Sequence, residues 1–247
     1  MISVCMATYN GGKYIERQLI SILRQLGPED EIVISDDGSS DNTVQIINSL
    51  NDSRILFLAH ERNLKKKNKL RSHYLVSLNF ENALKNAKGD FIFLADQDDI
   101  WADDKVEIMM FYLKSNSLVM SDCKVIDEDD NIVKESFFNK LKLPRGIFLN
   151  IKKPVYHGCC MAFKKDVLIK ALPFPEKLIL HDTWIGILAE NLDNVKFIED
   201  KLVFYRRHSL NTSFLGRKSN NTVLFQIKYR VALFFQITER ILCAKLS

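Results

Sequence analysis

The sequence is poor in glycine and proline and has no long apolar run. Its 247 residues include nine glycines and five prolines, too few for a fibrous or low-complexity chain, and no repeat of fixed period is visible. No stretch approaches the roughly 18 uninterrupted apolar residues of a membrane-spanning helix. Hydrophobic residues still make up 47% of the chain, which is enough for an ordinary core. We therefore expect one large domain, with at most a short appendage.

Cysteine is also scarce, and its spacing excludes familiar frameworks. The five cysteines contain no Cys-x-x-Cys pair, so they fit neither a zinc site nor a disulfide framework. The first apolar run, Ile2–Met6, lacks the basic region and length of a signal peptide. The expected location is the cytoplasm, with the cytoplasmic face of a membrane as a further option.

The net charge of +4 is mild and is concentrated in residues 62–71 and in the C-terminal tail. Such patches meet phosphate or anionic lipid, or they are solvated faces. The basic residues are not interleaved with aromatic ones and no reader motif is visible, so a nucleic-acid partner is not expected.

The first half of the chain alternates between two hydrophobic periods, that of strands and that of helices. The expected strands are Ile2–Met6, Glu31–Ser35, Arg54–Leu58 and Phe91–Ala95, and the expected helices are Ile15–Leu26, Thr43–Leu50 and Tyr74–Ala87. This alternation predicts an α/β fold in three layers with a mostly parallel sheet, whose ligands collect at the carboxyl ends of the strands.

The second half is less regular. An acidic turn at Asp127–Asp130, a helix near Asp182 and a strand at Phe197–Tyr205 are expected, and they suggest a smaller region packed on the sheet that closes one side of the crevice. The tail from Val223 to Leu246 has apolar residues near helical spacing with basic residues among them. It predicts a helix that lies in a membrane interface, or alternatively one that packs on the domain or in a dimer.

Polar residues follow the strands where a ligand would bind. Asp96, Gln97, Asp98 and Asp99 come directly after an apolar strand, and carboxylates so close together favour a divalent cation, Mg²⁺ or Mn²⁺. The alternative is a solvated acidic loop that caps a helix starting near Ala102.

Two further strand ends carry groups that suit a nucleotide. Asp36 and Asp37 precede Gly38 and can accept hydrogen bonds from a base or a ribose, although either can instead cap the following helix. Thr8, Tyr9 and Asn10 end the first strand, where the ring of Tyr9 can stack on a base or simply pack.

These residues, in this order and at strand ends, resemble the large family of inverting glycosyltransferases of the GT-A type, known as family two. The resemblance rests on residues 2–12, 34–41 and 95–101, and it continues through residues 157–163, 181–184 and 205–208, so that it covers about residues 1–213. The second set is similar to the branch that contains bacterial rhamnosyltransferases of cell-surface polysaccharide synthesis.

The resemblance implies a role for each matching position. The catalytic base is Asp182; the nucleotide and donor residues are Thr8, Tyr9, Asn10, Asp36, Asp37, Asp96 and Gln97; the metal residues are Asp98, Asp96 and His208; the acceptor-side residues are Asp99, Trp101, Gly158, His181 and Trp184. Two alternatives stay open. Asp182 precedes an apolar helix and can be an N-cap, and a lone histidine such as His208 can be a structural hydrogen-bonding group.

The expected protein is a metal-dependent glycosyltransferase domain at residues 1–213, with a nucleotide-sugar half at about 1–115, an acceptor half at about 116–213, and a helical tail at 214–247. It would move a sugar, with rhamnose as a candidate, from a nucleoside-diphosphate sugar to a glycan hydroxyl, and a lipid-linked acceptor would suit a tail at a membrane. Residues 62–71, where relatives are expected to have a shorter glycine-containing connection, would close over donor phosphates or face such acceptors. The rival functions are a nucleotidyltransferase and a non-catalytic sugar-nucleotide-binding subunit.

Overall fold

The computed structural model describes residues 1–60, 71–138, 146–176, 178, 180–191, 194–208 and 223–246. The basic run at residues 62–71 therefore lies almost wholly outside the described residues. The strands are β1 (Ile2–Thr8), β2 (Glu31–Asp36), β3 (Ile55–Ala59), β4 (Phe91–Asp96), β5 (Ile100–Trp101), β6 (Leu118–Ile126), β7 (Ile132–Lys134), β8 (Met161–Lys164) and β9 (Val195–Arg206). The helices are α1 (Ile15–Leu23), α2 (Thr43–Ser49), α3 (Arg71–Asn86), α4 (Lys105–Leu113), α5 (Ile147–Lys152), α6 (Lys165–Ala171), α7 (His181–Glu190) and α8 (Val223–Leu246), with a short 3₁₀ turn η1 (Gly158–Cys160).

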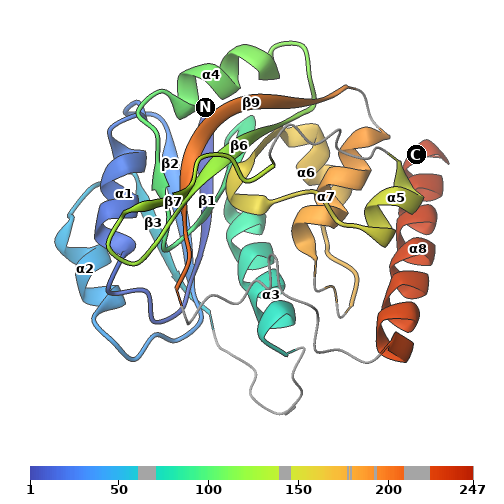
Figure 1. Ribbon diagram of the computed structural model, residues 1–247, viewed down its shortest axis with the longest axis horizontal. Helices are drawn as coiled ribbons and strands as arrows, with labels where there is room; N and C mark the ends of the chain where they lie inside the picture. Colours follow the sequence, from blue (N-terminus) through green and yellow to red (C-terminus); the bar gives the residue numbers. More distant parts are fainter. Residues whose placement is uncertain are drawn as a thin grey trace.

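These strands form one curled, mostly parallel sheet with helices around it (Figure 1). The strand order is β3-β2-β1-β4-β8-β6-β9-β5, and β7 pairs with β6. The strands β1 to β4 are parallel to one another, while β8 runs antiparallel to both β4 and β6. The α/β class and the three-layer arrangement predicted from the sequence are therefore confirmed.

The second half of the chain differs from its prediction, because it extends the sheet. We expected a smaller region packed on the sheet, yet β8 joins β4 through pairs such as Ile92 with Phe163. β6 and β9 then continue the sheet as a long parallel pair. Ala162 and Phe163 are fully buried, so this junction lies inside the core. A single sheet thus spans both halves.

The short segment after the acidic run also differs from its prediction. A helix was expected near Ala102, but Ile100–Trp101 forms β5, which pairs antiparallel with Phe204 and Val203 of β9. The helix α4 begins only at Lys105. The acidic run is therefore a connection between two strands of the same sheet and is held at both of its ends.

The central strands are apolar throughout because both of their faces are covered. Residues Val4–Met6, Ile32–Ile34 and Ile92–Ala95 have no exposed surface. On one side Ile15, Leu19 and Ile22 of α1 are equally buried, which is the spacing of one helix face. A rigid sheet therefore carries the polar strand ends.

The C-terminal helix α8 lies at one side of the molecule beside α5 and α7 (Figure 1). Leu233 and Ile237 are buried, and Arg240 donates hydrogen bonds to the carbonyl oxygens of Lys170, Leu172 and Pro173. One face of α8 therefore packs on the domain, as one of the two predicted alternatives has it. Among the described residues, no helix is both long enough and apolar enough to span a membrane.

Candidate functional site

The register of the parallel strands brings the predicted donor residues together. Thr8 pairs with Asp36 across β1 and β2, and Ala7 pairs with Asp96 across β1 and β4. The three strands therefore end at the same edge, where ligands of such sheets bind. The sequence predicted this coincidence, and the structure confirms it.

Asp36 is occupied by hydrogen bonds within the protein. Its Oδ1 accepts from Thr8 Oγ1 at 2.8 Å and from Ser39 Oγ at 2.6 Å, and its Oδ2 accepts from the backbone N of Ser39 at 2.8 Å. The residue is 3% exposed. These contacts hold the loop after β2 in place. Asp36 would therefore influence nucleotide binding indirectly, by fixing the conformation of that loop.

Asp37 faces a histidine that the sequence analysis did not single out. Its Oδ1 lies 2.7 Å from Nδ1 of His60, which follows β3, and its backbone N donates to Thr8 O at 2.9 Å. Only 3% of Asp37 is exposed. No motif marks His60, because the contact exists only once β2 and β3 are paired.

Tyr9 and Gln97 tie the ends of β1 and β4 to each other. The backbone N of Tyr9 donates to Gln97 Oε1 at 2.9 Å, and Gln97 Nε2 donates to Tyr9 O at 3.1 Å. Tyr9 as a whole residue is 41% exposed, so part of its surface is accessible to solvent. Gln97 thus acts as a brace between the strands.

The loop after Tyr9 is fixed by residues of the loop after β2. Asn10 has a positive φ of 50°, and its Oδ1 accepts from the backbone N of Ser40 at 2.8 Å. The backbone N of Gly12 donates to Asp41 Oδ2 at 3.0 Å, and Asp41 Oδ1 also accepts from Thr43 N at 3.0 Å. The two loops therefore form one hydrogen-bonded rim.

Asp98 is paired with His208, which lies far from it in the sequence. His208 Nε2 lies 2.8 Å from Asp98 Oδ2, and the two side chains are 8% and 13% exposed. The His208 ring stacks on Tyr14 with centroids 5.1 Å apart. The structure thus brings together two of the three residues that the resemblance assigns to a metal.

Arg206 holds the acidic run and the turn after β6 in place. Its backbone N donates to Asp99 Oδ1 at 2.9 Å, and its Nε donates to Asp98 O at 2.9 Å. Its guanidinium also pairs with Asp130 at 2.5 Å and lies 4.7 Å from the centre of the Tyr14 ring. Arg206 lies within residues 205–208, which carry part of the family resemblance, but the sequence predicts no role for it.

The carboxylates near the end of β4 crowd one another. Burial, together with the charges of Asp98 and Asp182, raises the pKa of Asp96 to about 7. Burial likewise raises the pKa of Asp99 well above its usual value. A divalent cation would relieve this repulsion, and the oxygen and imidazole ligands offered by Asp96, Asp98 and His208 suit Mg²⁺ or Mn²⁺. The residues present therefore fit the metal that the sequence predicts.

Asp182 lies in the first turn of α7 and does not cap it. The N-cap position belongs to Leu180, and no side chain forms a capping hydrogen bond there. Asp182 Oδ1 accepts from the neighbouring backbone N of Thr183 at 2.7 Å. A methyl group placed on Gly158 would lie 3.5 Å from His181 Nε2 and 3.8 Å from Asp182 Cβ. The helix-cap alternative for Asp182 therefore has no support in the geometry.

His181 is placed beside this carboxylate by α3. Its ring stacks on Phe80 with centroids 4.4 Å apart, and its Nδ1 lies 3.4 Å from Ser77 Oγ. Burial lowers the pKa of His181, which favours the neutral ring. Gly158, His181 and Asp182 thus come together on one side of the β4 end, as the acceptor-side prediction requires.

Three other predicted acceptor-side residues lie in the core. Trp101 and Trp184 are 1% and 0% exposed, and Asp99 is fully buried. Trp184 Nε1 donates to Ala171 O at 3.0 Å. Surrounding helices and strands cover these three side chains, so any role that they have on the acceptor side would be indirect. They support the site from behind.

Comparison with known proteins assigns the same class. A family model described as Glycosyl transferase family 2 matches residues 3–172. A glucosyltransferase of Escherichia coli, WfgD, named as acting on UDP-Glc and α-D-GlcNAc-diphosphoundecaprenol, is 30% identical over 77% of this chain and 71% of its own length. The dTDP-rhamnosyl transferase RfbG of Shigella flexneri is 28% identical over 91% of this chain and 77% of its own.

Solved structures share the fold. TarS of S. aureus, solved also with UDP and with UDP-GlcNAc, has a TM-score of 0.63 at 23% identity, over 83% of this chain and 60% of that one. The mannosyltransferase PcManGT of Pyrobaculum calidifontis, solved with GDP-Man and Mn²⁺, has a TM-score of 0.58 at 20% identity, over 87% of this chain and 58% of that one. The present chain thus spans about 60% of these structures, and 66% of an uncharacterized glycosyltransferase of Nostoc sp. that is 26% identical to it over 85% of this chain.

The raised pKa of Asp96 predicts that Asp96→Asn stabilises the metal-free protein at alkaline pH. The folded protein holds the proton more tightly than the unfolded chain, so this group's contribution to stability is lost as pH rises from about 4 through about 7. Asparagine carries no charge and escapes that loss. The gain in melting temperature, about 2–4 °C for each kcal/mol, should grow with pH and level off above about 7, as measured by circular dichroism in EDTA.

Asp41→Asn is the control with the opposite sign. Burial alone would raise the pKa of Asp41, but hydrogen bonds from Thr43 and Gly12 outweigh it and lower the pKa below its usual value. Its carboxylate therefore stabilises the folded state at neutral pH, and that contribution disappears in acid. Asp41→Asn should melt lower than wild type at pH 8. Equal melting curves for wild type and Asp96→Asn at pH 8 would contradict the assigned crowding.

Proposed function

Because the chain belongs to glycosyl transferase family 2, we propose that it transfers a sugar from a nucleoside-diphosphate sugar to a glycan hydroxyl, with inversion at the anomeric carbon. One observation carries this proposal. Asp96, Asp98 and Asp182 meet at the end of β4, close enough for the charges of the other two to raise the pKa of Asp96. That site lies beside the hydrogen-bonded rim formed by the loops after β1 and β2. A nucleoside diphosphate and its sugar would therefore bind between the acidic site and this rim.

The nucleotide half of the proposed site is the rim after β1 and β2. Tyr9 is exposed and offers its ring for stacking, and Asp37, oriented by His60 at 2.7 Å, offers a carboxylate to base or ribose. Asp36 and Gln97 would shape this pocket through their internal hydrogen bonds. The ring and the fixed carboxylate are separate elements of recognition, so each can be altered alone.

A divalent ion held by Asp98, Asp96 and His208 would supply positive charge to the leaving diphosphate. The protein's own contribution is to hold these ligands. His208 is kept against Tyr14, and Arg206 fixes the backbone of Asp98. Asp96 must give up its proton as the ion binds, which its pKa of about 7 allows at neutral pH.

Asp182 is the proposed general base. It stands at the start of α7 next to Gly158, where an acceptor hydroxyl can approach without meeting a side chain from that residue. Its carboxylate would take the proton of that hydroxyl as the oxygen attacks the anomeric carbon. The neutral His181 beside it adds no competing charge.

The proposed setting is cell-surface polysaccharide synthesis on the cytoplasmic side of a membrane. WfgD and RfbG are named for glucose and rhamnose transfer, respectively. Both sugars are therefore candidates for the donor of this chain. The name of WfgD includes a diphosphoundecaprenol acceptor, which supports a lipid-linked acceptor here. Membership of this family disfavours the nucleotidyltransferase alternative, and turnover separates an enzyme from a non-catalytic sugar-nucleotide-binding subunit.

The first test is a donor screen with Asp98→Asn as the variant. Wild-type protein should bind one nucleoside-diphosphate sugar in a Mn²⁺-dependent way and transfer its sugar to a diphosphoundecaprenol-linked acceptor. Asp98→Asn removes a charged ligand, so it should weaken Mn²⁺-dependent donor binding in calorimetry and abolish most transfer. Asp90→Asn is the matched control, because Asp90 precedes the same strand at its opposite end and is exposed. Unchanged metal-dependent binding in Asp98→Asn would refute the metal assignment.

The second test concerns the base. Asp182→Asn keeps the size of the side chain but removes the proton acceptor, so transfer should fall roughly 10²–10⁴-fold while donor affinity and melting temperature stay close to wild type. The measurement is the single-turnover rate with a bound donor. Asp166→Asn is the matched control, since Asp166 also lies in the first turn of a helix, α6. Near-normal turnover in Asp182→Asn would mean that another group is the base.

We also propose that α8 attaches the protein to an anionic membrane surface. Its exposed apolar side chains are Leu224, Ile227, Val231, Phe235 and Leu242, at 49–65% exposure. At 100° per residue these five form one stripe, opposite the buried Leu233 and Ile237. The helix is therefore apolar on two faces, and only one of them packs on the domain.

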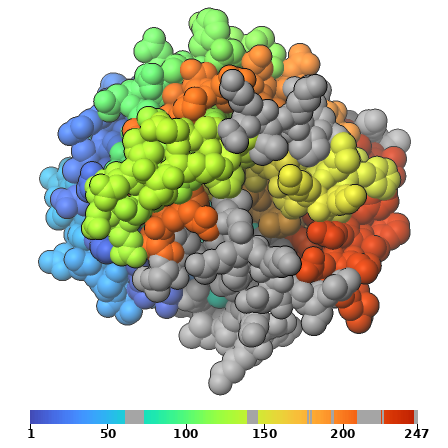
Figure 2. All heavy atoms as spheres, viewed as in Figure 1, coloured from blue at the N-terminus to red at the C-terminus, as the bar shows by residue number. Residues whose placement is uncertain are grey.

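Neighbouring residues favour lipid as the occupant of the second face. Phe148 and Leu149 of α5 are 76% and 52% exposed, and Phe148 lies beside Phe234 of α8 with ring centroids 5.1 Å apart. Exposed Lys152, Lys153 and Lys228 lie around them. Exposed apolar groups with exposed lysines near them in the sequence suit an anionic bilayer. Figure 2 shows α8 in red at the surface of the molecule.

The test replaces the outer stripe and keeps the inner face. A triple variant with Ile227→Gln, Val231→Gln and Phe235→Gln should lose sedimentation with phosphatidylglycerol vesicles and keep its melting temperature and donor binding. Ile132→Gln with Val133→Gln, two exposed apolar residues of β7, is the matched control and should sediment like wild type. If the triple variant sediments normally, or if it changes only the oligomeric state in light scattering, the membrane proposal is wrong.

A further inference from the structure

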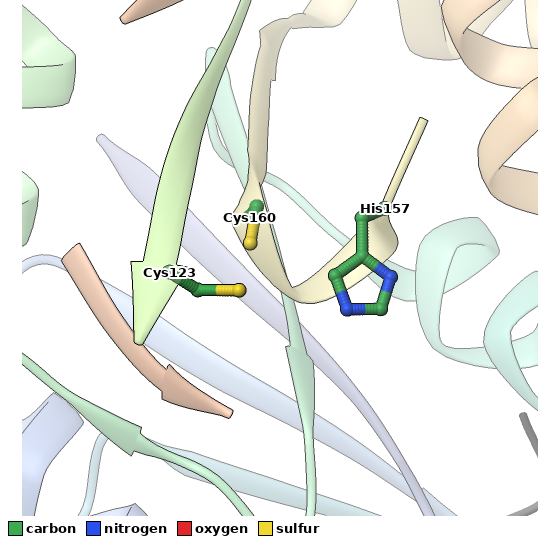
Figure 3. Close-up of side chains that lie close together, drawn as sticks. All are labelled: Cys123, His157 and Cys160. Carbon is green, nitrogen blue, oxygen red and sulfur yellow. The ribbon is translucent and has the colours of Figure 1, made fainter. Parts of the chain in front are cut away.

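Three side chains of types that bind metals meet in the core next to the acidic site. Cys123 of β6, Cys160 of η1 and His157 just before η1 place one possible ligand atom each within 4.8 Å of the others (Figure 3). Cys123 and Cys160 are fully buried, and His157 is 7% exposed. The proposed transfer reaction uses none of them.

Local geometry explains how two of the three ligands meet. His157 and Cys160 are separated by two residues, and the backbone N of Cys160 donates to His157 O at 3.0 Å. This hydrogen bond closes a tight turn that brings both side chains to the same side, as two-residue spacers do in zinc knuckles. The sequence signal for this pair is His-x-x-Cys, which the absence of Cys-x-x-Cys pairs does not exclude.

The His157 ring is oriented by its neighbours, yet one of its nitrogens has no partner. The ring stacks on Phe137 with centroids 5.5 Å apart and meets Tyr205 edge-on at 4.9 Å. Its Nε2 is buried and forms no hydrogen bond within the described part of the chain. A buried polar atom left unsatisfied costs about 1–3 kcal/mol, so such an atom in a folded protein calls for a ligand. Figure 3 shows the His157 ring beside the sulfur atoms of Cys123 and Cys160.

We propose that Cys123, His157 and Cys160 bind a thiophilic divalent metal ion, with Zn²⁺ as the representative of this class. Ligand atoms around tetrahedral zinc, at about 2.3 Å for sulfur and about 2.0 Å for nitrogen, lie roughly 3.3–3.8 Å apart. The observed limit of 4.8 Å therefore needs only small movements of the three side chains.

Charge favours a divalent ion in this place. Two thiolates and one divalent cation sum to zero when the imidazole is neutral, whereas thiolates alone would be costly in a buried site.

The bound ion would join β6 to the turn that forms one wall of the proposed active site. Gly158, between the ligands His157 and Cys160, lies beside His181 and Asp182. The ion is therefore a structural staple, chemically distinct from the hard-ion site at Asp98. Thiolate ligands select zinc over magnesium, so the two sites can be told apart by their metals.

The test measures metal directly and does not depend on transfer. The full chain, reduced, without a histidine tag and in excess Mg²⁺, is titrated with Co²⁺ and then with Zn²⁺. We expect a near-ultraviolet thiolate-to-Co²⁺ charge-transfer band that saturates at one equivalent, its loss on adding one equivalent of Zn²⁺, and a higher melting temperature with Zn²⁺. The absence of this band in the wild-type chain would overturn the proposal.

Variants assign the ligands. Cys123→Ser and Cys160→Ser should lose the band and the retained zinc, whereas His157→Cys, which keeps three ligands, should retain zinc and shift the band. Cys5→Ser, which removes a buried thiol on β1, and Asp98→Asn should show the same Co²⁺ band and retain the same amount of zinc as wild type. Retention of one zinc by both ligand variants would overturn the proposal. So would a metal-free wild-type chain lighter by two hydrogens, because it would carry a Cys123–Cys160 disulfide instead.

Discussion

Mutual repulsion among carboxylates at the end of β4 is the constraint on which the rest of the site depends. Asp96, Asp98 and Asp99 follow one another within four residues, and Asp182 adds its charge from α7. Left alone, such a cluster favours protonation or unfolding. Positive and polar groups surround the cluster. Arg206 binds the backbone carbonyl of Asp98 and the side chain of Asp130 in the turn after β6, and His208 contacts the Asp98 side chain. The negative charge that these groups leave uncompensated would favour a bound cation.

The polar residues around this centre divide into two kinds. One kind forms its hydrogen bonds within the protein and so fixes the positions of the loops; it comprises Asp36, Asp41 and Gln97. Tyr9, on one of those loops, is exposed, and Asp182, in the first turn of α7, is partly exposed. A site made in this way keeps its geometry before any ligand arrives, and such preorganisation is what electrostatic catalysis requires.

Continuity of the sheet connects the two halves of the molecule. Because β8 pairs with both β4 and β6, the turn before β8 sits directly beside the acidic centre. The buried thiols and His157 gather under that turn, and α7 places Asp182 over it. The second half of the chain is therefore positioned by the same sheet that carries the first half, and a change at this junction would affect both halves.

The sequence by itself determined the α/β fold and the strand ends of the first half, and it placed Thr8, Asp36 and Asp96 at those ends. These features follow from local signals, namely the spacing of apolar residues and the positions of short loops. Only the tertiary structure decided which of these side chains are buried and which polar groups meet. Trp184, which the resemblance assigns to the acceptor side, is buried, while His60 carried no local signal and contacts Asp37. Such pairings depend on strand order and helix packing, which bring together residues far apart in the chain, and no local pattern records them.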